Sequence, residues 1–382
     1  MPELPEVETV ARDLRGLVVG ATITGARGDW PPAIASHPTV EAFADAVAGR
    51  RVEAVGRRAK LVVVHLSGGA GTPGRDPAGR DPAALTIHLK MTGQLFVVPA
   101  GSAVDRHVHV RLALADGREL RFRDIRKFGR VGCWPLDPAT GELLDPAAGG
   151  DLFAAFGPEP LDDAFTLRAF RARLRPRRGR LKPLLLDQAF IAGVGNIYAD
   201  EALWRARLHP LRSAATLRPS DEARLYRELR AILGEAIERR GSSIDDYTAP
   251  DGDGSMQERL DVYQRTGEPC PHCGRQIRRI VVGARATHFC SWCQRLPAAD
   301  RAGAAAILRA ARARAARAPA TKGRRWTELA AEGSLGLTPA EAERAAARAR
   351  AERTQRAAAT RRADARAGAG GARARARAGE GA

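Results

Sequence analysis

The sequence predicts an α+β protein of several domains: a β-sandwich with a leading helix, a helical domain, a zinc-binding hairpin and a disordered basic tail. Three observations support this fold class. Short strand-like runs succeed one another in the first third of the chain, helical spacing dominates from about residue 165, and two pairs of cysteines lie close together after residue 265. We place the domains at residues 1–150, 151–260, 261–296 and 297–382.

The first domain opens with apolar residues at helical spacing over residues 3–19, and Gly20 ends that predicted helix. Asp116-Gly117 is a typical hairpin turn. Because strand follows strand with no helix between them, we expect a β-sandwich or barrel. We interpret the Gly/Pro/Asp-rich residues 67–84 as a flexible surface loop. The seven predicted strands are 51–55, 60–66, 85–89, 94–98, 107–114, 119–123 and 130–134.

The second domain has a helical pattern that begins near Phe165. Its last predicted helix has Ser220 as a candidate N-cap and Gly241 as a stop, with an apolar stripe between them. We interpret residues 248–256 as a mobile loop because Pro, Asp, Gly and Ser dominate there. The predicted helices are 166–175, 182–191, 196–207 and 220–240.

Four of the five cysteines form two pairs, with two residues inside each pair and sixteen residues between the pairs. This spacing brings four thiolates around one tetrahedral zinc ion, and four sulfur ligands leave no open position for catalysis. Arg285 lies near the tip of the intervening hairpin, where a guanidinium can hold phosphate. We expect Cys133 to be buried and His272 and His288 to be surplus to the metal site. The predicted ligands are Cys270, Cys273, Cys290 and Cys293.

The formal net charge is +18, and most of it lies in the tail, because residues 301–382 carry 19 Lys or Arg and 7 Asp or Glu. Eight Lys or Arg also crowd residues 168–182 without an acid, which suits phosphate binding. The tail is either a nonspecific arm on nucleic acid or a dispensable solvated extension. No apolar run reaches the length of a membrane span and no signal peptide opens the chain, so we expect a cytoplasmic protein without a membrane partner.

The chain begins Met1-Pro2-Glu3-Leu4-Pro5-Glu6, and this hexapeptide has two interpretations. Removal of Met1 would leave Pro2 with a free secondary amine. Terminal amines titrate near about pH 8, and an amine that attacks an aldehydic carbon forms a cationic iminium ion. Glu3 and Glu6 would then supply carboxylates for proton transfer. Alternatively, the two prolines only set φ for the first turn of a helix.

The opening hexapeptide, a central Gly-Val-Gly-Asn turn and the cysteine hairpin together resemble the bacterial formamidopyrimidine-DNA glycosylases. Members of that family excise oxidised purines and nick the abasic site that results. The Leu4-Pro5 opening favours this family over its endonuclease VIII relatives, which prefer oxidised pyrimidines. The resemblance runs from Pro2 to about Arg295. Its motifs are Pro2–Thr9, Arg57–Lys60, His88–Gly93, Asp124–Gly129, Gly157–Leu161 and Gly193–Tyr198.

The resemblance implies a glycosylase and abasic-site lyase of base excision repair that acts as a monomer on double-stranded DNA and holds one structural zinc ion. Pro2 would attack C1′ of the damaged nucleotide, Glu3 would donate a proton at the sugar, and Glu6 would be a supporting carboxylate. Lys60 matches a lysine credited with a role in β-elimination. Without the family, Lys60 would be interpreted as an exposed edge-strand lysine. Arg285 matches the finger arginine tied to δ-elimination and phosphate binding.

The resemblance also implies how the damaged base leaves the helix. A flipped base leaves a gap in the stack, and Met91, Arg126 and Phe128 match the three side chains that fill it. Lys90 departs from the pattern, since the family usually has glycine there. The Gly193–Gly195 loop resembles a helix–two-turn–helix in which backbone N–H groups approach phosphate. Further DNA contacts are implied for His107, Arg177, Lys182 and Asn196.

Two alternatives stay open on the sequence alone. One is a related glycosylase for oxidised pyrimidines, and the other is a non-catalytic module that binds damaged DNA. A binding module has no need of a free proline amine, yet the chain keeps Pro2, Glu3, Lys60 and Arg285 together. The pattern therefore favours the oxidised-purine enzyme.

Overall fold

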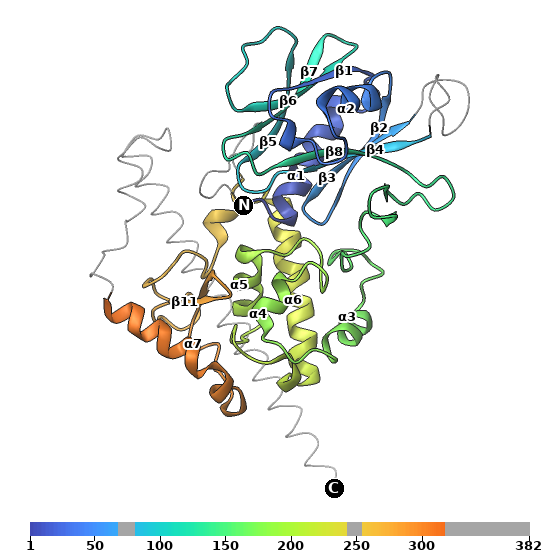
Figure 1. The fold of residues 1–382 in the computed structure, drawn as a ribbon. Coiled ribbons are helices and arrows are strands. Elements are labelled where there is room, and N and C mark those ends of the chain that lie inside the picture. The colour runs from blue at the N-terminus through green and yellow to red at the C-terminus, as the bar shows by residue number, and fades with distance from the viewer. Residues whose placement is uncertain (68–80, 243–253, 318–382) are drawn as a thin grey trace, which may run out of the picture. The chain divides into compact units, whose positions relative to one another are not determined.

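The computed structural model describes residues 1–67, 81–242 and 254–317 (Figure 1). The described residues divide into two compact units, one within residues 1–206 and 210–260, and the other made of residues 207–209 and 261–317. The predicted loops 67–84 and 248–256 fall mostly outside the described residues. None of the helices within the described ranges is both long and apolar enough to cross a membrane.

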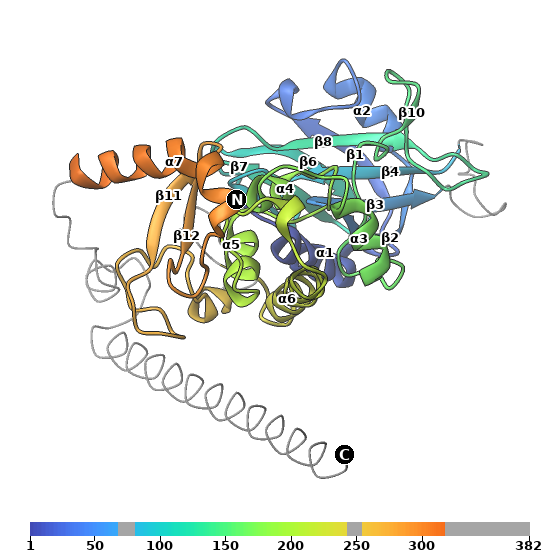
Figure 2. The same cartoon turned by 90° about the horizontal axis from the view of Figure 1, so that it is seen from below.

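Two four-stranded antiparallel sheets form a β-sandwich in the first unit, which confirms the predicted fold class (Figures 1 and 2). Helix α1 (Leu4–Val18) contacts β2 and β3, and the β6–β7 hairpin turns at Gly117, whose φ is +82°. One sheet has the order β1 (Ile23–Gly28), β6 (Val108–Leu114), β7 (Arg118–Asp124) and β5 (Gly93–Pro99). The other has the order β2 (Arg51–Arg58), β3 (Leu61–Ser67), β4 (Ala83–His88) and β8 (Arg130–Pro135). A small ladder joins β9 (Leu144–Asp145) to β10 (Gly150–Asp151).

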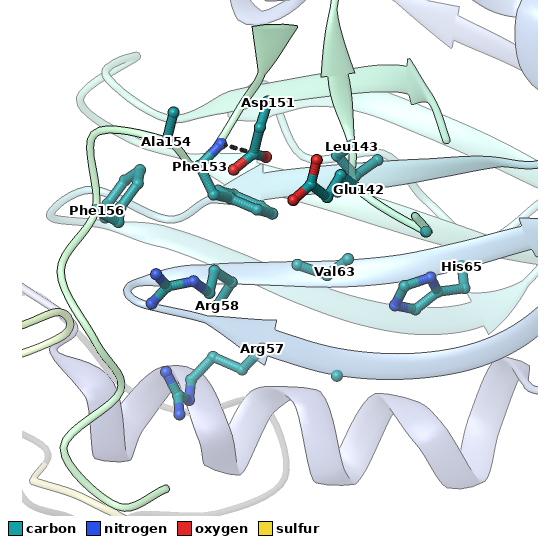
Figure 3. A pocket seen from close by; sticks show the side chains of 12 residues that line it. Arg57, Arg58, Val63, His65, Glu142, Leu143, Asp151, Phe153, Ala154 and Phe156 are labelled. Atoms are coloured by element: carbon teal, nitrogen blue, oxygen red, sulfur yellow. Dashed lines mark hydrogen bonds between the residues drawn. The ribbon is translucent and has the colours of Figure 1, made fainter. Parts of the chain in front are cut away.

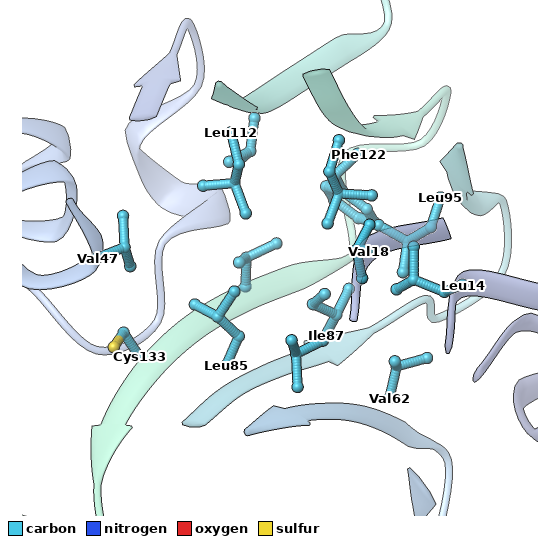
Figure 4. Packing of buried hydrophobic residues seen from close by; sticks show 14 of the residues in the cluster. Leu14, Val18, Val47, Val62, Leu85, Ile87, Leu95, Leu112, Phe122 and Cys133 are labelled. Atoms are coloured by element: carbon cyan, nitrogen blue, oxygen red, sulfur yellow. The ribbon is translucent and has the colours of Figure 1, made fainter. Parts of the chain in front are cut away.

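Apolar side chains from both sheets and from α1 form one buried cluster (Figure 4). Leu85 and Ile87 of β4 lie in it together with Leu112 of β6 and Phe122 of β7. Each fully buried aliphatic or aromatic side chain contributes roughly 1.5–3 kcal/mol. Cys133 lies in this cluster, as its place in a strand predicts. The cluster holds the two sheets as a rigid support for the loops at their ends.

Two elements of the sandwich escape the sequence prediction. Strand β1 buries only Ile23 fully and contains two glycines, so it lacks the alternation that marks a half-buried strand. Helix α2 (Val40–Val47) has only eight residues, and it is started by Thr39, whose hydroxyl accepts from Ala42 N at 3.1 Å. Phe43 of α2 is fully buried in the cluster. Helix α2 is too short for a helical period of apolar residues to be recognised in the sequence.

The helical part of the first unit contains four helices among its described residues. The helix predicted at 182–191 ends at Leu186, because the Asp187 carboxylate accepts from Ala189 N at 2.9 Å and forms a turn. The last helix begins at Pro219 with Arg218 as N-cap, so the predicted cap Ser220 is wrong by two residues. The helices are α3 (Leu167–Leu174), α4 (Leu181–Leu186), α5 (Asn196–Arg205) and α6 (Pro219–Glu238), with 3₁₀ turns η1 (Pro31–Ala33), η2 (Ala214–Thr216) and η3 (Met256–Arg259) in the same unit.

The second unit holds the predicted hairpin and one helix. Strand β11 (Arg278–Val282) pairs with β12 (Arg285–Phe289), and Val282 lies opposite Arg285. Helix α7 (Ala298–Arg317) contacts β11 and buries Ala304. The prediction of a largely disordered segment at 297–382 did not include this helix. Alanine has the highest helix propensity, and packing on β11 stabilises a segment that composition alone leaves marginal. Residues 318–382 lie outside the described part of the chain.

Candidate active site and nucleic-acid interface

The predicted nucleophile and its acidic neighbours lie at the start of α1, in the interior of the first unit. Pro2, Glu3 and Glu6 are all buried. The main chain is anchored here by Leu4 N, which donates to Gly193 O at 3.0 Å. The opening segment is therefore an ordered part of the interior, and its backbone is not frayed.

The carboxylate of Glu3 lies at the N-terminus of α5. Its Oε1 accepts from Ile197 N at 2.8 Å and its Oε2 from Tyr198 N at 3.4 Å. Free N–H groups at a helix start attract negative charge. A Cβ on Gly195 would lie 2.3 Å from the Glu3 Cδ, so only glycine leaves room for this approach. The close backbone approach that the sequence assigns to phosphate is made, in this structure, to Glu3.

Burial has a large effect on the acidity of Glu3. Desolvation raises its pKa from 4.5 to about 7, while the charge of Lys60 opposes that rise and the charge of Glu6 adds to it. The two amides from α5 also favour the ionised form, although their effect is smaller. A carboxyl with this pKa carries its proton about half the time at neutral pH, which suits a general acid.

Glu6 joins three segments of the chain. Its Oε2 accepts from Glu3 N at 2.8 Å, and its Oε1 accepts from the Tyr198 hydroxyl at 2.5 Å and from Ser242 N at 2.8 Å. The Ser242 hydroxyl lies 3.1 Å from the same oxygen. Sequence reasoning missed Tyr198 and Ser242 as parts of the site. Tyr198 ends the Gly193–Tyr198 motif, which was its only local signal, and Ser242 has none beyond its place after the helix stop.

Lys60 is held at the turn between β2 and β3 and is buried, in contrast to the exposed edge-strand lysine of the alternative interpretation. The preceding residue, Ala59, has a φ of +54°, and its N–H donates to Glu159 Oε1 at 2.6 Å. Arg57 and Arg58 also pair with Glu159, at 2.7 and 2.9 Å. These three contacts of Glu159 fix the turn that carries Lys60, whose charge acts on Glu3.

A cavity of about 520 Å³ is lined in part by Arg57 and Arg58, the two arginines that pair with Glu159 (Figure 3). Arg58, His65 and Glu142 line it, together with Phe153 and Phe156. The Arg58 guanidinium carbon lies 6.0 and 5.7 Å from the centroids of the two phenylalanine rings. None of the predicted site residues lines this cavity.

The three predicted gap-filling side chains lie on two loops at one end of the sandwich. Met91 is half-buried in the loop 89–92, between β4 and β5. Arg126 and Phe128 lie in the loop 125–129, between β7 and β8, and Phe128 is 49% exposed. The Arg126 guanidinium carbon lies 5.0 Å from the Phe128 ring centroid. Exposed side chains on loops can contact DNA, whereas apolar side chains in the core cannot.

The remaining predicted DNA contacts differ in accessibility. His107 is half-buried directly before β6, and Arg177 is exposed after α3. Asn196 is the first residue of α5, and its Oδ1 is buried without a hydrogen-bond partner among the described residues. Lys182 is fully buried and pairs with Asp200 at 2.6 Å. The fold thus gives Lys182 an internal ion pair, and its phosphate contact stays a prediction.

The four paired cysteines in the second unit meet as predicted. Their sulfur atoms all lie within 4.8 Å of one another, a spacing that fits four thiolates around one tetrahedral zinc ion. His272 Nδ1 lies 3.5 Å from the Cys293 sulfur but belongs to no ligand group, and His288 packs on Tyr263. Arg285 is exposed beside the turn formed by Gly283 and Ala284, both at positive φ. The zinc site is structural, and it stiffens the hairpin that presents Arg285.

Comparisons with known proteins agree with this geometry along most of the chain. The formamidopyrimidine-DNA glycosylase N-terminal domain matches residues 1–131, the H2TH domain of the same glycosylases matches 156–248, and the zinc finger found in FPG and IleRS matches 267–296. The formamidopyrimidine-DNA glycosylase of Chloroflexus aurantiacus is 48% identical over 296 residues, which cover 77% of this chain and 98% of that protein.

Two solved structures extend the comparison to three dimensions. The MutM (Fpg) protein of Thermus thermophilus is 41% identical with a TM-score of 0.64, over 78% of this chain and 100% of that one. Wild-type Fpg of Lactococcus lactis, solved with DNA that contains N7-benzyl-Fapy-dG, is 34% identical with a TM-score of 0.66, over 77% of this chain and 100% of that one. Helix α7 lies beyond all three family matches.

Proposed function

This chain belongs to the formamidopyrimidine-DNA glycosylase family, and we propose that Pro2, once Met1 is removed, is its nucleophile. The chain is a base excision repair enzyme that acts on DNA with oxidised purines, both as a glycosylase and as an abasic-site lyase. The observation that supports Pro2 is the buried Glu3 next to it in the chain, with a pKa near neutrality. A nucleophile and a proton donor of matched pKa are what the first step requires.

We propose the following order of steps. The Pro2 amine attacks C1′, the bond from C1′ to the damaged base breaks, and the base leaves with the proton that the Pro2 nitrogen gives up. Glu3 protonates the sugar ring oxygen, so the ring opens and Pro2 is linked to C1′ as an iminium ion. The iminium is an electron sink that acidifies C2′, so loss of a C2′ proton expels the 3′ phosphate. Lys60 assists that elimination. Arg285 assists the second one, in which loss of a C4′ proton expels the 5′ phosphate, and water then hydrolyses the iminium and frees Pro2.

Glu6 acts through Glu3 and the backbone in this scheme. By holding Glu3 N at 2.8 Å it fixes the main chain that follows Pro2. We propose that Met91, Arg126 and Phe128 fill the gap left by the flipped base, and that His107, Arg177, Lys182 and Asn196 contribute to DNA binding. We further propose that the enzyme works as a cytoplasmic monomer, and that the domains 1–150, 151–260 and 261–296 are its functional divisions, with 297–382 as an extension.

Borohydride trapping on duplex DNA with 8-oxoguanine opposite cytosine tests the proposal. Borohydride reduces the iminium to a stable amine, so the processed chain forms a covalent adduct with DNA. The matched control is the same chain with an uncleaved extension before Pro2, compared before and after protease removes the extension. We expect adduct only after removal. Adduct formation by the blocked chain would exclude Pro2, and stronger activity on oxidised pyrimidines would contradict the purine assignment.

A further inference from the structure

The two loops that carry the gap-filling side chains are neighbours because their strands pair. Strand β5 begins at Gly93, directly after the loop 89–92, and β7 ends at Asp124, directly before the loop 125–129. Gly93 and Asp124 are register partners in the ladder between these strands. The last residue of β7 therefore lies where both loops leave the sheet.

The side chain of Asp124 binds both loops. It is 1% exposed, and its Oδ1 accepts from the Thr92 hydroxyl in one loop and from Arg126 N, at 3.2 Å, in the other. Its Oδ2 accepts from Gly129 N at 2.6 Å. Thr92 Oγ1 also lies 3.2 Å from Arg126 N. One buried carboxylate thus holds the beginning and the end of the loop 125–129 and ties it to the loop 89–92.

Both loops have a backbone conformation that needs such support. Lys90, next to Met91, has a φ of +55°, and Lys127, between Arg126 and Phe128, has a φ of +58°. Residues with a Cβ rarely adopt positive φ, and such a conformation persists only where surrounding contacts determine it. A Cβ on Gly129 would lie 2.3 Å from the Phe122 ring and 3.1 Å from Asp124 Oδ2, so the loop end is also sterically fixed.

We infer that Asp124 is a positioning residue for base flipping: it holds Met91, Arg126 and Phe128 as one preformed group that fills the gap in the stack. This inference rests on the proposed gap-filling role of those three side chains. A preformed group loses little conformational freedom when it enters the DNA, because its side chains are already ordered in the free protein. The carboxylate does not touch substrate.

Asp124→Asn is the sharpest test, because it keeps the shape and removes the second acceptor. An amide has one oxygen and one NH₂ group, so it cannot accept from Gly129 N and from the Thr92 side at once. The matched control is Asp116→Asn, which changes an exposed carboxylate in the β6–β7 turn that pairs with Arg118. Thr92→Val and Thr92→Ser form a second pair, since only serine keeps the hydroxyl.

Two substrates separate positioning from chemistry. Excision of 8-oxoguanine from a duplex requires the gap to be filled, whereas cleavage of an abasic site in single-stranded DNA does not. We expect Asp124→Asn to lose on the order of tenfold or more in single-turnover excision and to keep single-strand cleavage within about twofold. A 2-aminopurine opposite the lesion reports insertion by fluorescence, and its signal should fall with Asp124→Asn and Thr92→Val but not with Thr92→Ser or Asp116→Asn.

Each outcome decides the inference. A wild-type excision rate and fluorescence change in Asp124→Asn would overturn it, and so would equal losses on both substrates, which would assign the residue to general stability alone. If the proposed function is wrong, the experiment gives a different result, because the wild-type chain itself would then cleave neither substrate. The ratio of the two rates in variant and wild type therefore tests Asp124 once the wild-type chain has been shown to cleave both substrates.

Discussion

Replacing Glu3 by glutamine tests whether the buried carboxyl beside Pro2 is the general acid. Its pKa of about 7 arises chiefly from burial, with Lys60 lowering it and Glu6 raising it. About nine tenths of the Glu3 side chains hold a proton at about pH 6, and about one tenth do so at about pH 8. Glutamine fills the same volume without an acidic proton. We expect Glu3→Gln to slow single-turnover excision by about 10²–10⁴-fold, the usual contribution of a positioned acid.

The assay is single-turnover excision of 8-oxoguanine between about pH 5.5 and about pH 9, with Glu41→Gln as the control. Glu41 lies on α2, and its side chain is exposed. We expect the rate of the wild type and of the control to fall at alkaline pH, because Glu3 loses its proton. That fall should be absent from Glu3→Gln. The reasoning is refuted if Glu3→Gln stays within about threefold of wild type or keeps the alkaline fall.

The same pKa determines how stability depends on pH. Native Glu3 holds its proton up to about pH 7, whereas the unfolded chain releases it near pH 4.5. Between these values the native state binds more protons, so the free energy of unfolding falls as pH rises. A difference from 4.5 to about 7 corresponds to about 3 kcal/mol. Urea unfolding of wild type and Glu3→Gln at both ends of this range measures it, and equal pH slopes would contradict the raised pKa.

Three further predictions concern the support of the site. Gly195→Ala should displace Glu3 and reduce excision at least tenfold, because its Cβ would lie 2.3 Å from the Glu3 Cδ, whereas Gly16→Ala in α1 meets nothing within 4 Å and should retain wild-type excision. Tyr198→Phe removes one of the hydrogen bonds to the buried Glu6 and should lower the free energy of unfolding by about 1–3 kcal/mol in urea titrations. Cys290→Ser should abolish stoichiometric zinc, as metal analysis would show, and weaken DNA binding; intact zinc would exclude Cys290 as a ligand.

Periodicity and turn chemistry predicted most of the fold, because these signals are local. Strands β2 to β8, helix α1 and the hairpin at Gly117 all followed from patterns within a few residues. Strand β1 and helix α2 did not, since one lacks alternation and the other is too short to show a period. The end of α4 depended on the side chain of Asp187, which competes with the helix for backbone N–H groups.

The site could be predicted only where a motif itself contains residue types that are chemically reactive. The opening hexapeptide alone left Pro2 open to a purely structural interpretation, and the resemblance to the family supplied the predicted roles of Pro2 and Glu3. The groups that hold Glu3 and Glu6 come from α5 and from Ser242, far along the sequence. The Gly193–Gly195 loop indicates that another group lies close to its backbone, but the sequence does not identify that group. Lys182 belongs to a basic cluster by composition, yet helix packing buries it against Asp200.

The distances along the chain between these partners constrain the order in which the protein becomes active during synthesis. The Pro2 amine is free as soon as Met1 is cut from the nascent chain. Glu3, however, meets Ile197 across 194 residues, and Glu6 meets Ser242 across 236. A ribosome-bound fragment that lacks these residues therefore has a reactive amine without its organised acid. In the proposed mechanism, the proton donor Glu3 gains its contact with Ile197 only after just over half of the chain has been made, and Glu6 gains Ser242 only after nearly two thirds.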